Sequence, residues 1–275
     1  MQTLTTPDGL TLALRRWPAA GAPRGTVQIV HGLGEHIGRY ERVAAALNAA
    51  GWNVAGHDLR GHGRSGGPRG TIPAQRSMLD DVALVMDHLR GARLGAAQRP
   101  HVLLGHSMGG LIAATLCAEA PPLRAVDGLV LSSPALDPGL SAGQKLLLAL
   151  AAPLAPRLRL GNGLNPDHVS RDPAVVAAYR TDPLVHDRVT PRLVRFIVDG
   201  GRYVIERAPH WKVPTLLMWG GADRLVAPRG SAAFAAAAPQ PLVTAREWPG
   251  LAHEIFNEPE RAQVLATLTA WLARF

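Results

Sequence analysis

The pentapeptide at residues 105–109, Gly-His-Ser-Met-Gly, constrains the fold of this chain more than any other feature of its sequence. An apolar run, Val102–Leu104, leads directly into it, and a helical pattern begins near Gly110. A G-x-S-x-G sequence between a strand and a helix is typical of a nucleophile elbow, a sharp turn that holds a serine in a strained conformation. The alternative is a glycine-rich turn whose serine only caps the helix, but the flanking elements favour the elbow. Ser107 is therefore the candidate nucleophile.

Short apolar runs alternate with helical patterns along the chain, which predicts a mostly parallel sheet covered by helices. Residues 3–6 and 10–17 flank the turn sequence Pro-Asp-Gly and are expected to form an antiparallel hairpin. Six further strands, expected to be buried, are Thr26–Val30, Asn53–Gly56, Val102–Leu104, Gly128–Leu131, Thr215–Trp219 and Val243–Trp248. The expected helices are Tyr40–Ala50, Met78–Leu94, Leu111–Glu119, Ala232–Ala238 and Pro259–Phe275. This order predicts an α/β fold with an eight-stranded sheet and helices on both faces.

One stretch interrupts this alternation. Between about Asp137 and Lys212 the sequence has an apolar run at Leu146–Leu154, turns punctuated by prolines and two short helical patterns. We interpret residues 137–212 as a helical cap inserted into the α/β core, which residues 1–136 and 213–275 form. The apolar run is too short to span a bilayer, and we expect it to be partly exposed at the mouth of a pocket.

The composition limits the environment and the partners of the chain. Hydrophobic residues make up 47% of the 275 residues, which is enough for one large α/β domain. No apolar run reaches the roughly 20 residues that span a bilayer, the first residues lack a signal-peptide pattern, and the single cysteine cannot form an internal disulfide. We therefore expect a cytoplasmic protein. The formal charge of +8 comes from scattered arginines, which argues against nucleic-acid binding but permits attraction to an anionic membrane surface.

A serine hydroxyl needs a general base, and the base needs an acid that orients it. In a fold with a G-x-S-x-G elbow, the acid and then the histidine follow the serine along the chain. Asp223 follows the predicted strand Thr215–Trp219, and only one of the eleven histidines, His253, comes after it. Both would lie at carboxyl ends of strands, where open α/β sheets place their active sites. We predict a catalytic triad of Ser107, Asp223 and His253, with Asp137 as the alternative acid.

Acyl transfer through a serine also builds negative charge on the carbonyl oxygen, which backbone N–H groups must stabilise. The first donor is expected to be the amide of Met108, directly after the nucleophile. The second is expected in the loop after the strand Thr26–Val30, which reads His-Gly-Leu-Gly-Glu. We assign it to Leu33, with neighbouring amides as alternatives, because the glycines let this backbone approach a substrate closely.

His57, Asp58 and His62 are residue types that bind metals, but they lie on a glycine-rich loop rather than on one helix face. No cysteine lies nearby, and the sequence implies no fourth ligand. We therefore predict no metal and no cofactor, and a structural role for this loop. His106, beside the nucleophile, is expected to pack rather than to act as a base.

Several of these segments, taken in order, resemble the monoacylglycerol lipase and lysophospholipase branch of the α/β-hydrolases, of the serine aminopeptidase S33 type. The resemblance extends over nearly the whole chain. The segments that carry it are His31–His36 with Gly38–Tyr40, Gly56–Ser65, Gly105–Gly110, Leu131–Leu136, Ala222–Val226 and His253–Glu254. The first is the most specific, because general esterases rarely combine Gly-x-Gly-Glu-His with Gly-Arg-Tyr.

The resemblance implies an α/β-hydrolase fold and cleavage of a single acyl chain from a glycerol-type head group through an acyl-enzyme intermediate. It places the second oxyanion amide at Leu33, and it implies a polar head-group pocket shaped by Glu35 and Arg39, near Tyr179 of the cap. The partners would be a small lipid ester and, transiently, a membrane surface that the cap touches. The cap matches poorly outside residues 179–184. A short- to medium-chain carboxylesterase is therefore the alternative enzyme, and a non-catalytic binding protein of this fold is the alternative class.

Overall fold

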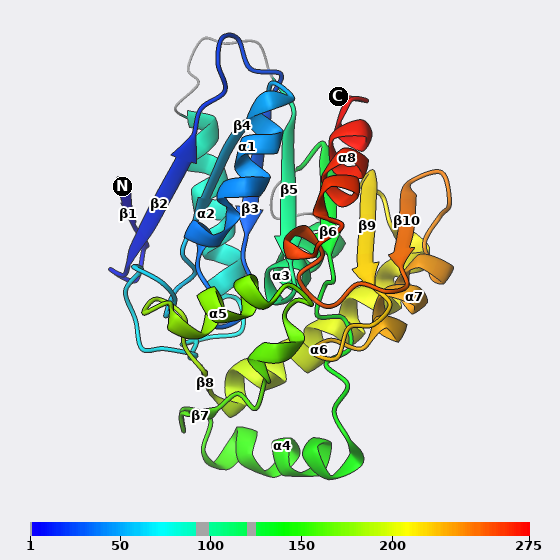
Figure 1. Ribbon diagram of the computed structural model, residues 1–275. Coiled ribbons are helices and arrows are strands. Elements are labelled where there is room, and N and C mark those ends of the chain that lie inside the picture. Colours follow the sequence, from blue (N-terminus) through cyan, green and yellow to red (C-terminus); the bar gives the residue numbers. More distant parts are fainter. Residues whose placement is uncertain (1, 92–98, 120–124) are drawn as a thin grey trace.

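The fold is built on one twisted sheet (Figure 1). The computed structural model describes residues 2–91, 99–119 and 125–275 of the chain. The eight strands of the sheet lie in the order β1-β2-β4-β3-β5-β6-β9-β10. Among the described strands of this sheet, only the β1–β2 and β2–β4 pairs are antiparallel, and the other neighbouring pairs are parallel. The strands are β1 Gln2–Thr5, β2 Thr11–Trp17, β3 Thr26–Val30, β4 Asn53–His57, β5 His101–His106, β6 Gly128–Ser132, β9 Thr215–Gly220 and β10 Val243–Trp248. The predicted α/β fold with a mostly parallel eight-stranded sheet is confirmed.

Helices cover both faces of the sheet. The α-helices of the described residues are α1 Glu41–Ala49, α2 Ser77–Gly91, α3 Met108–Ala118, α4 Ala142–Leu154, α5 Pro173–Thr181, α6 Pro191–Arg207, α7 Pro228–Ala237 and α8 Arg261–Leu272. The buried side chains of α1 and α8 join one hydrophobic cluster, and those of α3 and α7 join another on the opposite face together with four from α2. Val85 and Leu89 of α2 pack instead in a third cluster. Every predicted helix is present, and residues 92–94 of the predicted helix Met78–Leu94 lie outside the described residues.

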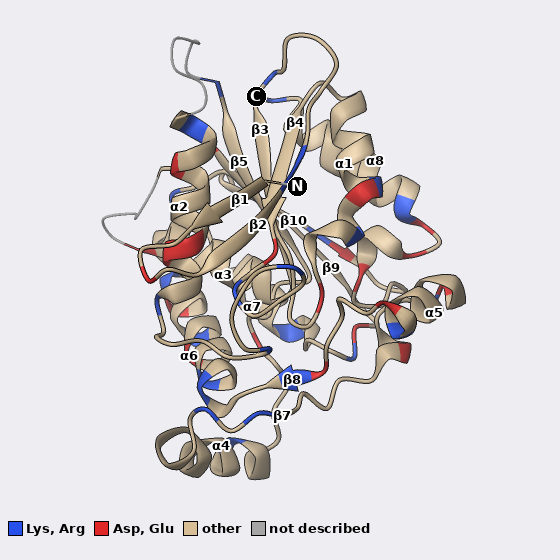
Figure 2. Ribbon diagram, turned by 90° about the vertical axis from the view of Figure 1, so that its left-hand side faces the viewer, with Lys and Arg blue, Asp and Glu red and all other residues tan. Residues whose placement is uncertain are grey.

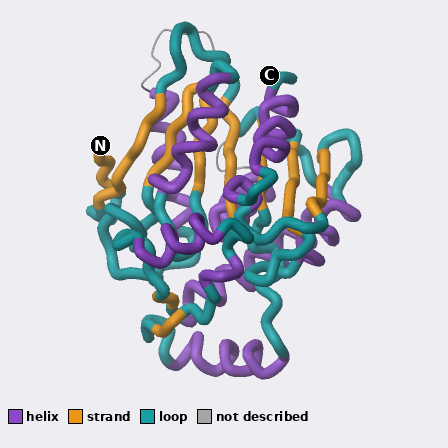
Figure 3. Tube along the Cα trace, viewed as in Figure 1, coloured by secondary structure: helices purple, strands orange, loops and turns teal. Residues whose placement is uncertain are grey.

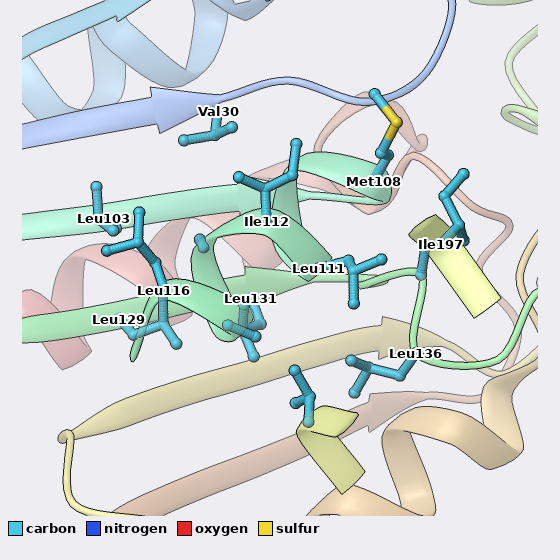
Figure 4. Close-up of a cluster of buried hydrophobic side chains, with 14 of the residues drawn as sticks. Val30, Leu103, Met108, Leu111, Ile112, Leu116, Leu129, Leu131, Leu136 and Ile197 are labelled. Atoms are coloured by element: carbon cyan, nitrogen blue, oxygen red, sulfur yellow. The ribbon is translucent and has the colours of Figure 1, made fainter. Parts of the chain in front are cut away.

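The central strands send side chains into both hydrophobic clusters. On β5, Leu103 packs under α2 and α3, whereas Val102 and Leu104 pack under α1 and α8. Figure 4 shows Leu103 beside Ile112 and Leu116 of α3. A shift of one residue would exchange the two faces of the strand, so the burial of both faces fixes the register of β5. The position of the turn after β5 is fixed with it.

The last strand differs from its prediction. β10 was expected to be buried, but its four central residues are exposed and only Val243 and Trp248 are buried. The reason is that β10 forms the edge of the sheet and pairs with β9 alone. The expectation of burial for this strand is therefore wrong.

The β6–β9 segment, residues 133–214, lies beyond the carboxyl ends of the parallel strands (Figures 1 and 3). It contains α4, α5 and α6, and a two-residue antiparallel ladder between β7 (Leu160–Gly161) and β8 (Arg188–Val189) that the sequence did not predict. The expectation of only short helical patterns beside the apolar run is wrong for α6, which has 17 residues. Phe196 and Ile197 of α6 pack against the cluster that contains α3.

Helix α4 exposes most of its large apolar side chains. The exposed fraction is 64% for Leu146, 66% for Leu147 and 82% for Leu154, whereas Leu148 is buried. The expected partial exposure of the run Leu146–Leu154 is confirmed, whereas its place at the mouth of a pocket stays a prediction. With 13 residues, α4 is shorter than a bilayer span requires. No helix among the described residues combines the length and the hydropathy that would let it cross a membrane.

Basic and acidic positions alternate over the helices and loops that Figure 2 displays. On α6, for example, Arg195 pairs with Asp199 at 2.5 Å and Arg202 pairs with Glu206 at 2.7 Å, each one helical turn apart. Such exposed pairs contribute little to stability, because water and salt screen them. The basic residues are thus spread over the molecule, and several of them are paired with acidic neighbours.

Candidate active site

Ser107 lies in the sharp turn between β5 and α3. Its backbone has φ 54° and ψ −123°, a conformation that is strained for any residue with a side chain. Two glycines make the turn possible. A Cβ at Gly105 would lie 2.5 Å from the carbonyl oxygen of Gly109, and a Cβ at Gly109 would lie 2.1 Å from that of Val30. The close approach of β3, β5 and α3 therefore requires glycine at both positions, and it presents the serine at the end of β5.

Asp223 and His253 meet at the carboxyl ends of β9 and β10. Asp223 Oδ2 lies 2.6 Å from His253 Nδ1, and both side chains are buried. The second oxygen of Asp223 accepts the backbone N–H groups of Leu225 at 2.8 Å and Val226 at 3.0 Å. The carboxylate is held by its own turn, so it fixes the orientation of the imidazole and leaves Nε2 for another partner.

Asp137, the alternative acid, is placed elsewhere. Its carboxylate receives Arg229 Nε at 2.6 Å and the backbone N–H of Gly139 at 2.8 Å, and the side chain is 30% exposed. The structure thus brings Asp223, rather than Asp137, to His253.

The environment of the pair favours charge separation. Burial raises the pKa of Asp223, but the adjacent His253 and the two backbone N–H donors lower it by more than burial raises it. The pKa of Asp223 is therefore below the usual range. Burial lowers the pKa of His253, but the Asp223 carboxylate raises it more, so the net pKa is above the usual range. Asp223 would therefore stabilise an imidazolium at His253, which is what a general base becomes when it accepts a proton.

His253 lies next to the turn that carries the serine. Its ring packs against the ring of His106, with 4.7 Å between the centroids. His106 Nδ1 is 3.1 Å from both the carbonyl oxygen and the hydroxyl of Ser132, and burial lowers the pKa of His106 to about 4. His106 therefore packs as a neutral ring, as expected from its position in the turn.

Residues 31–36, which are predicted to supply an oxyanion amide and are called the oxyanion loop below, pass beside Ser107. A Cβ at Gly32 would lie 3.1 Å from Cβ of Ser107, so the two backbones are in close contact. The N–H of Gly32 donates to Glu35 Oε1 at 2.7 Å, which leaves the amide of Leu33 as the next donor along the loop. Met108 begins α3, where backbone N–H groups have no partner within the helix. The two amides predicted as donors therefore lie in segments next to Ser107: Leu33 in the loop after β3 and Met108 at the start of α3.

Glu35 and Arg39 belong to a buried ionic network behind this loop. Glu35 accepts the hydroxyl of Tyr40 at 2.8 Å as well as the Gly32 amide, and its other oxygen receives Arg39 at 2.9 Å. Arg39 also forms a bidentate pair with Glu254 at 2.5 and 2.8 Å. Burial raises the pKa of Glu35, but Arg39 and nearby imidazoles bring it down to about 2. The network therefore fixes the loop through charged hydrogen bonds.

Glu254 and Tyr40 are two residues of the site for which the sequence predicts no separate role. Tyr40 belongs to the segment Gly38–Tyr40 and begins the predicted helix Tyr40–Ala50, and Glu254 follows His253. That adjacency was the available signal, because a carboxylate beside a catalytic histidine is well placed to bind a cation of a neighbouring loop. Its partner, Arg39, is 215 positions away in the sequence, and no local pattern identifies it.

Tyr179 of α5 lies next to both the oxyanion loop and Arg39. Its ring stacks over the Arg39 guanidinium at 4.7 Å, and its hydroxyl would lie 3.6 Å from a Cβ at Gly34. It lines a cavity of about 320 Å³ whose described lining also includes Asp182, His186 and Leu225. Glu35 and Arg39 instead line a cavity of about 10 Å³, room for a single water molecule. The three residues expected at the head-group pocket are therefore divided between the cavity and the network behind the loop.

The loop after β4 is held together by its own polar residues. Asp58 accepts the backbone N–H groups of Ile37 at 2.8 Å and Arg64 at 2.7 Å. The buried ring of His62 packs against His186 at 4.6 Å between centroids. In the part of the chain that the structure describes, no group of three or more His, Cys, Asp or Glu side chains is arranged so that it could hold a metal ion.

Comparisons with known proteins agree over nearly the whole chain. The family described as "Serine aminopeptidase, S33" matches residues 21–260. A monoacylglycerol lipase of Mycolicibacterium smegmatis is 36% identical over 272 residues, which cover 96% of this chain and 93% of the relative. The phospholipase YtpA of Bacillus subtilis is 32% identical and covers 93% of this chain and 98% of its own length. The crystal structure of Paleococcus ferrophilus monoacylglycerol lipase superposes with a TM-score of 0.84 at 33% identity, covering 95% of this chain and 98% of the other.

Proposed function

The chain belongs to the Hydrolase_4 family (serine aminopeptidase, S33), and we propose that this serine ester hydrolase acts on monoacylglycerols or lysophospholipids. The observation that carries the proposal is the 2.6 Å contact between Asp223 and His253, with the His253 ring beside the strained turn of Ser107. Relatives that span nearly the whole chain bear the names monoacylglycerol lipase and phospholipase, which supports this substrate class.

In the proposed mechanism, Ser107 Oγ attacks the ester carbonyl carbon while His253 Nε2 accepts the hydroxyl proton. Asp223 holds the opposite edge of the imidazole and stabilises its positive charge. The amides of Leu33 and Met108 receive the negative charge on the carbonyl oxygen. The C–O bond to the head group then breaks, His253 returns the proton to the leaving alcohol, and an acyl ester remains on the serine. Water, deprotonated by His253, attacks this ester. The acyl bond to Ser107 Oγ breaks, the fatty acid leaves, and His253 returns the proton to Ser107 Oγ.

For the head group we propose the cavity that Tyr179 lines, with the tyrosine hydroxyl as a donor or acceptor for glycerol-type hydroxyls. Glu35 and Arg39 would shape the same pocket without contacting the head group. Their network would hold the oxyanion loop in place, and the head group would rest against that loop. A mixed polar and apolar lining suits a hydroxylated head joined to one acyl chain.

We further propose that residues 137–212 act as a cap over the α/β core of residues 1–136 and 213–275, and that the cap touches lipid surfaces transiently. Exposed leucines on α4 lie in the same segment as the exposed basic residues Lys145, Arg157 and Arg159. An apolar helix face with cations nearby suits contact with anionic lipid. The single cysteine supports a reducing compartment, and we propose the cytoplasm.

The proposal is tested by offering the purified protein 1- and 2-monoacylglycerols, lysophosphatidylcholine, and nitrophenyl esters of increasing chain length. A Ser107→Ala variant and labelling by a fluorophosphonate probe identify the nucleophile. We expect monoacylglycerol hydrolysis and probe labelling that the variant loses by about 10³-fold or more. Activity confined to acetyl and butyryl esters would support the carboxylesterase alternative. No hydrolysis and no labelling would support a binding protein.

A further inference from the structure

Glu258 is a buried carboxylate that takes no part in the mechanism above. It lies just before α8, and none of its surface is exposed to solvent. A buried carboxylate is costly unless hydrogen-bond donors surround it. Glu258 has four: Ser170 Oγ at 2.8 Å, Arg171 N at 2.6 Å, Arg171 Nε at 2.5 Å and the backbone N–H of Ala252 at 3.1 Å. This single side chain is thus saturated by donors from two separate parts of the molecule.

The two parts are the cap and the loop that carries the catalytic histidine. Ser170 and Arg171 belong to the cap, and Ala252 directly precedes His253. A second connection lies on the other side of the histidine, where the N–H of Glu254 donates to the carbonyl oxygen of a cap residue, Val169, at 2.8 Å. Residues 169–171 of the cap therefore hold the backbone at both neighbours of His253, once directly and once through Glu258.

The orientation of His253 depends on this backbone. Catalytic groups must be held within about 0.5 Å of their productive geometry, and misplacement by about 1 Å costs up to 10²-fold in rate. Asp223 fixes one edge of the imidazole, but a rotation of the peptide between Leu251 and Ala252, directly before His253, would shift the backbone of His253 and move the ring relative to Ser107. The Ala252 amide donates to Glu258, and this hydrogen bond opposes such a rotation.

We propose that Glu258 is a positioning residue that ties the His253 loop to residues 169–171 of the cap, so that alignment of the general base depends on the base of the cap. The inference rests on the serine-hydrolase chemistry proposed above and not on the identity of the lipid. If it is correct, the cap has two parts with different roles. Residues 169–171 stay docked through catalysis, and any movement that admits substrate belongs to other parts of the cap, such as the exposed helix α4.

The test compares Glu258→Gln with Glu260→Gln. Glu260 also pairs with Arg171 but, in the described contacts, does not touch the His253 loop, so it is a matched control. With a nitrophenyl ester we expect Glu258→Gln to lower kcat by about 10- to 100-fold and to leave KM within about twofold, because alignment rather than binding is lost. Glu260→Gln is expected to retain the wild-type kcat.

The pH profile separates positioning from general destabilisation. In the wild type, burial lowers the pKa of His253 but Asp223 raises it more, so the acidic limb of kcat/KM lies above the usual histidine range. A misaligned His253 loses part of its contact with Asp223, so we expect the limb of Glu258→Gln to move to lower pH. A merely structural role for Glu258 would lower the melting temperature without moving this limb.

Hydrogen exchange provides a readout that does not depend on activity. Peptides covering residues 249–256 and 166–172 are expected to exchange faster in Glu258→Gln and at the wild-type rate in Glu260→Gln. If Glu258→Gln does not fold, Ser170→Ala removes one of the four donors and is expected to lower kcat by about 3- to 10-fold in the same direction. The inference would be overturned if the folded variants of Glu258 or Ser170 had the kcat, the acidic limb of kcat/KM and the exchange rates of the wild type. An inactive wild type with faster exchange in Glu258→Gln would overturn the proposed function alone.

Discussion

At the residue scale, the strained conformation of Ser107 is maintained by the glycines packed around it. We expect Gly109→Ala to destabilise the fold by about 3 kcal/mol, because its new methyl group would lie 2.1 Å from the Val30 carbonyl oxygen and would force β3 and α3 apart. Urea unfolding measures the change. Gly143→Ala on α4, where a Cβ meets nothing within 4 Å, is the matched control and is expected to stay within about 0.5 kcal/mol of wild type. Equal effects of the two substitutions would contradict the packing argument.

The second prediction at this scale concerns which aspartate is the acid of the proposed triad. Asp223→Asn is expected to reduce kcat by about 10³- to 10⁴-fold, because an amide no longer favours the imidazole tautomer that carries its proton on Nδ1. Asp137→Asn is expected to change kcat little, since Asp137 pairs with Arg229 and not with His253. Steady-state hydrolysis of a nitrophenyl ester distinguishes the two. A tolerant Asp223 combined with a sensitive Asp137 would mean that the acid follows β6 instead of β9.

At the scale of elements, the sequence predicts the strands, helices and turns that a pattern of neighbouring residues identifies. Strands buried on both faces are continuous apolar runs, so their positions were clear, and the G-x-S-x-G turn identified its own serine. The length of α6 was missed because Gly200 and Gly201 interrupt its helical pattern. The structure supplies the reason at Gly201, where a Cβ would lie 2.3 Å from the Leu136 carbonyl oxygen. The β7–β8 ladder has two residues in each strand and no periodicity to detect.

Long-range partners in the site had no such signal. The order of serine, aspartate and histidine was readable because each residue ends a recognisable strand. The pairing of Arg39 with Glu254 and of Glu258 with Arg171 depends on how distant loops come together in the fold. A sequence pattern that identifies an acidic residue does not say whether it will face solvent, a substrate or a buried arginine.

Helix α4 allows stability and surface binding to be separated. Leu148→Ala is expected to cost about 2 kcal/mol or more of unfolding free energy, because Leu148 is the buried leucine of this helix. Leu147→Ala removes a side chain that is 66% exposed and is expected to change stability by less than about 0.5 kcal/mol. It should instead weaken sedimentation with anionic vesicles, since the apolar surface available to lipid decreases. Unchanged vesicle binding by Leu147→Ala would argue against α4 as the lipid contact.

At the scale of the whole molecule, the cap and the core together are expected to select the acyl chain. Each buried methylene contributes roughly 0.8 kcal/mol, which corresponds to about a fourfold gain in kcat/KM per methylene until the acyl site is full. We therefore expect kcat/KM to rise from acetyl to medium-chain nitrophenyl esters, and monoacylglycerols to be cleaved far better than triacylglycerols. A profile that falls from acetyl onward would contradict an apolar acyl site.

The molecule as a whole should lose activity at a higher pH than it loses its fold. The proposed general base, His253, has a raised pKa, since the Asp223 carboxylate outweighs the effect of burial, and a base is active only when neutral. Activity is therefore expected to decline as the pH falls through a value above the usual 6.5 of histidine. The fold depends instead on carboxylates such as Glu35, whose pKa is about 2 in the folded state and 4.5 as a reference value. A group with a depressed folded pKa stabilises the fold above its unfolded pKa, and this contribution disappears as the pH falls from about 4.5 towards 2. At pH 5 we expect a folded but nearly inactive protein that recovers full activity at pH 8. Circular dichroism and ester hydrolysis measured on the same samples check this, and simultaneous loss of both signals would show that the fold, rather than His253, limits activity in acid.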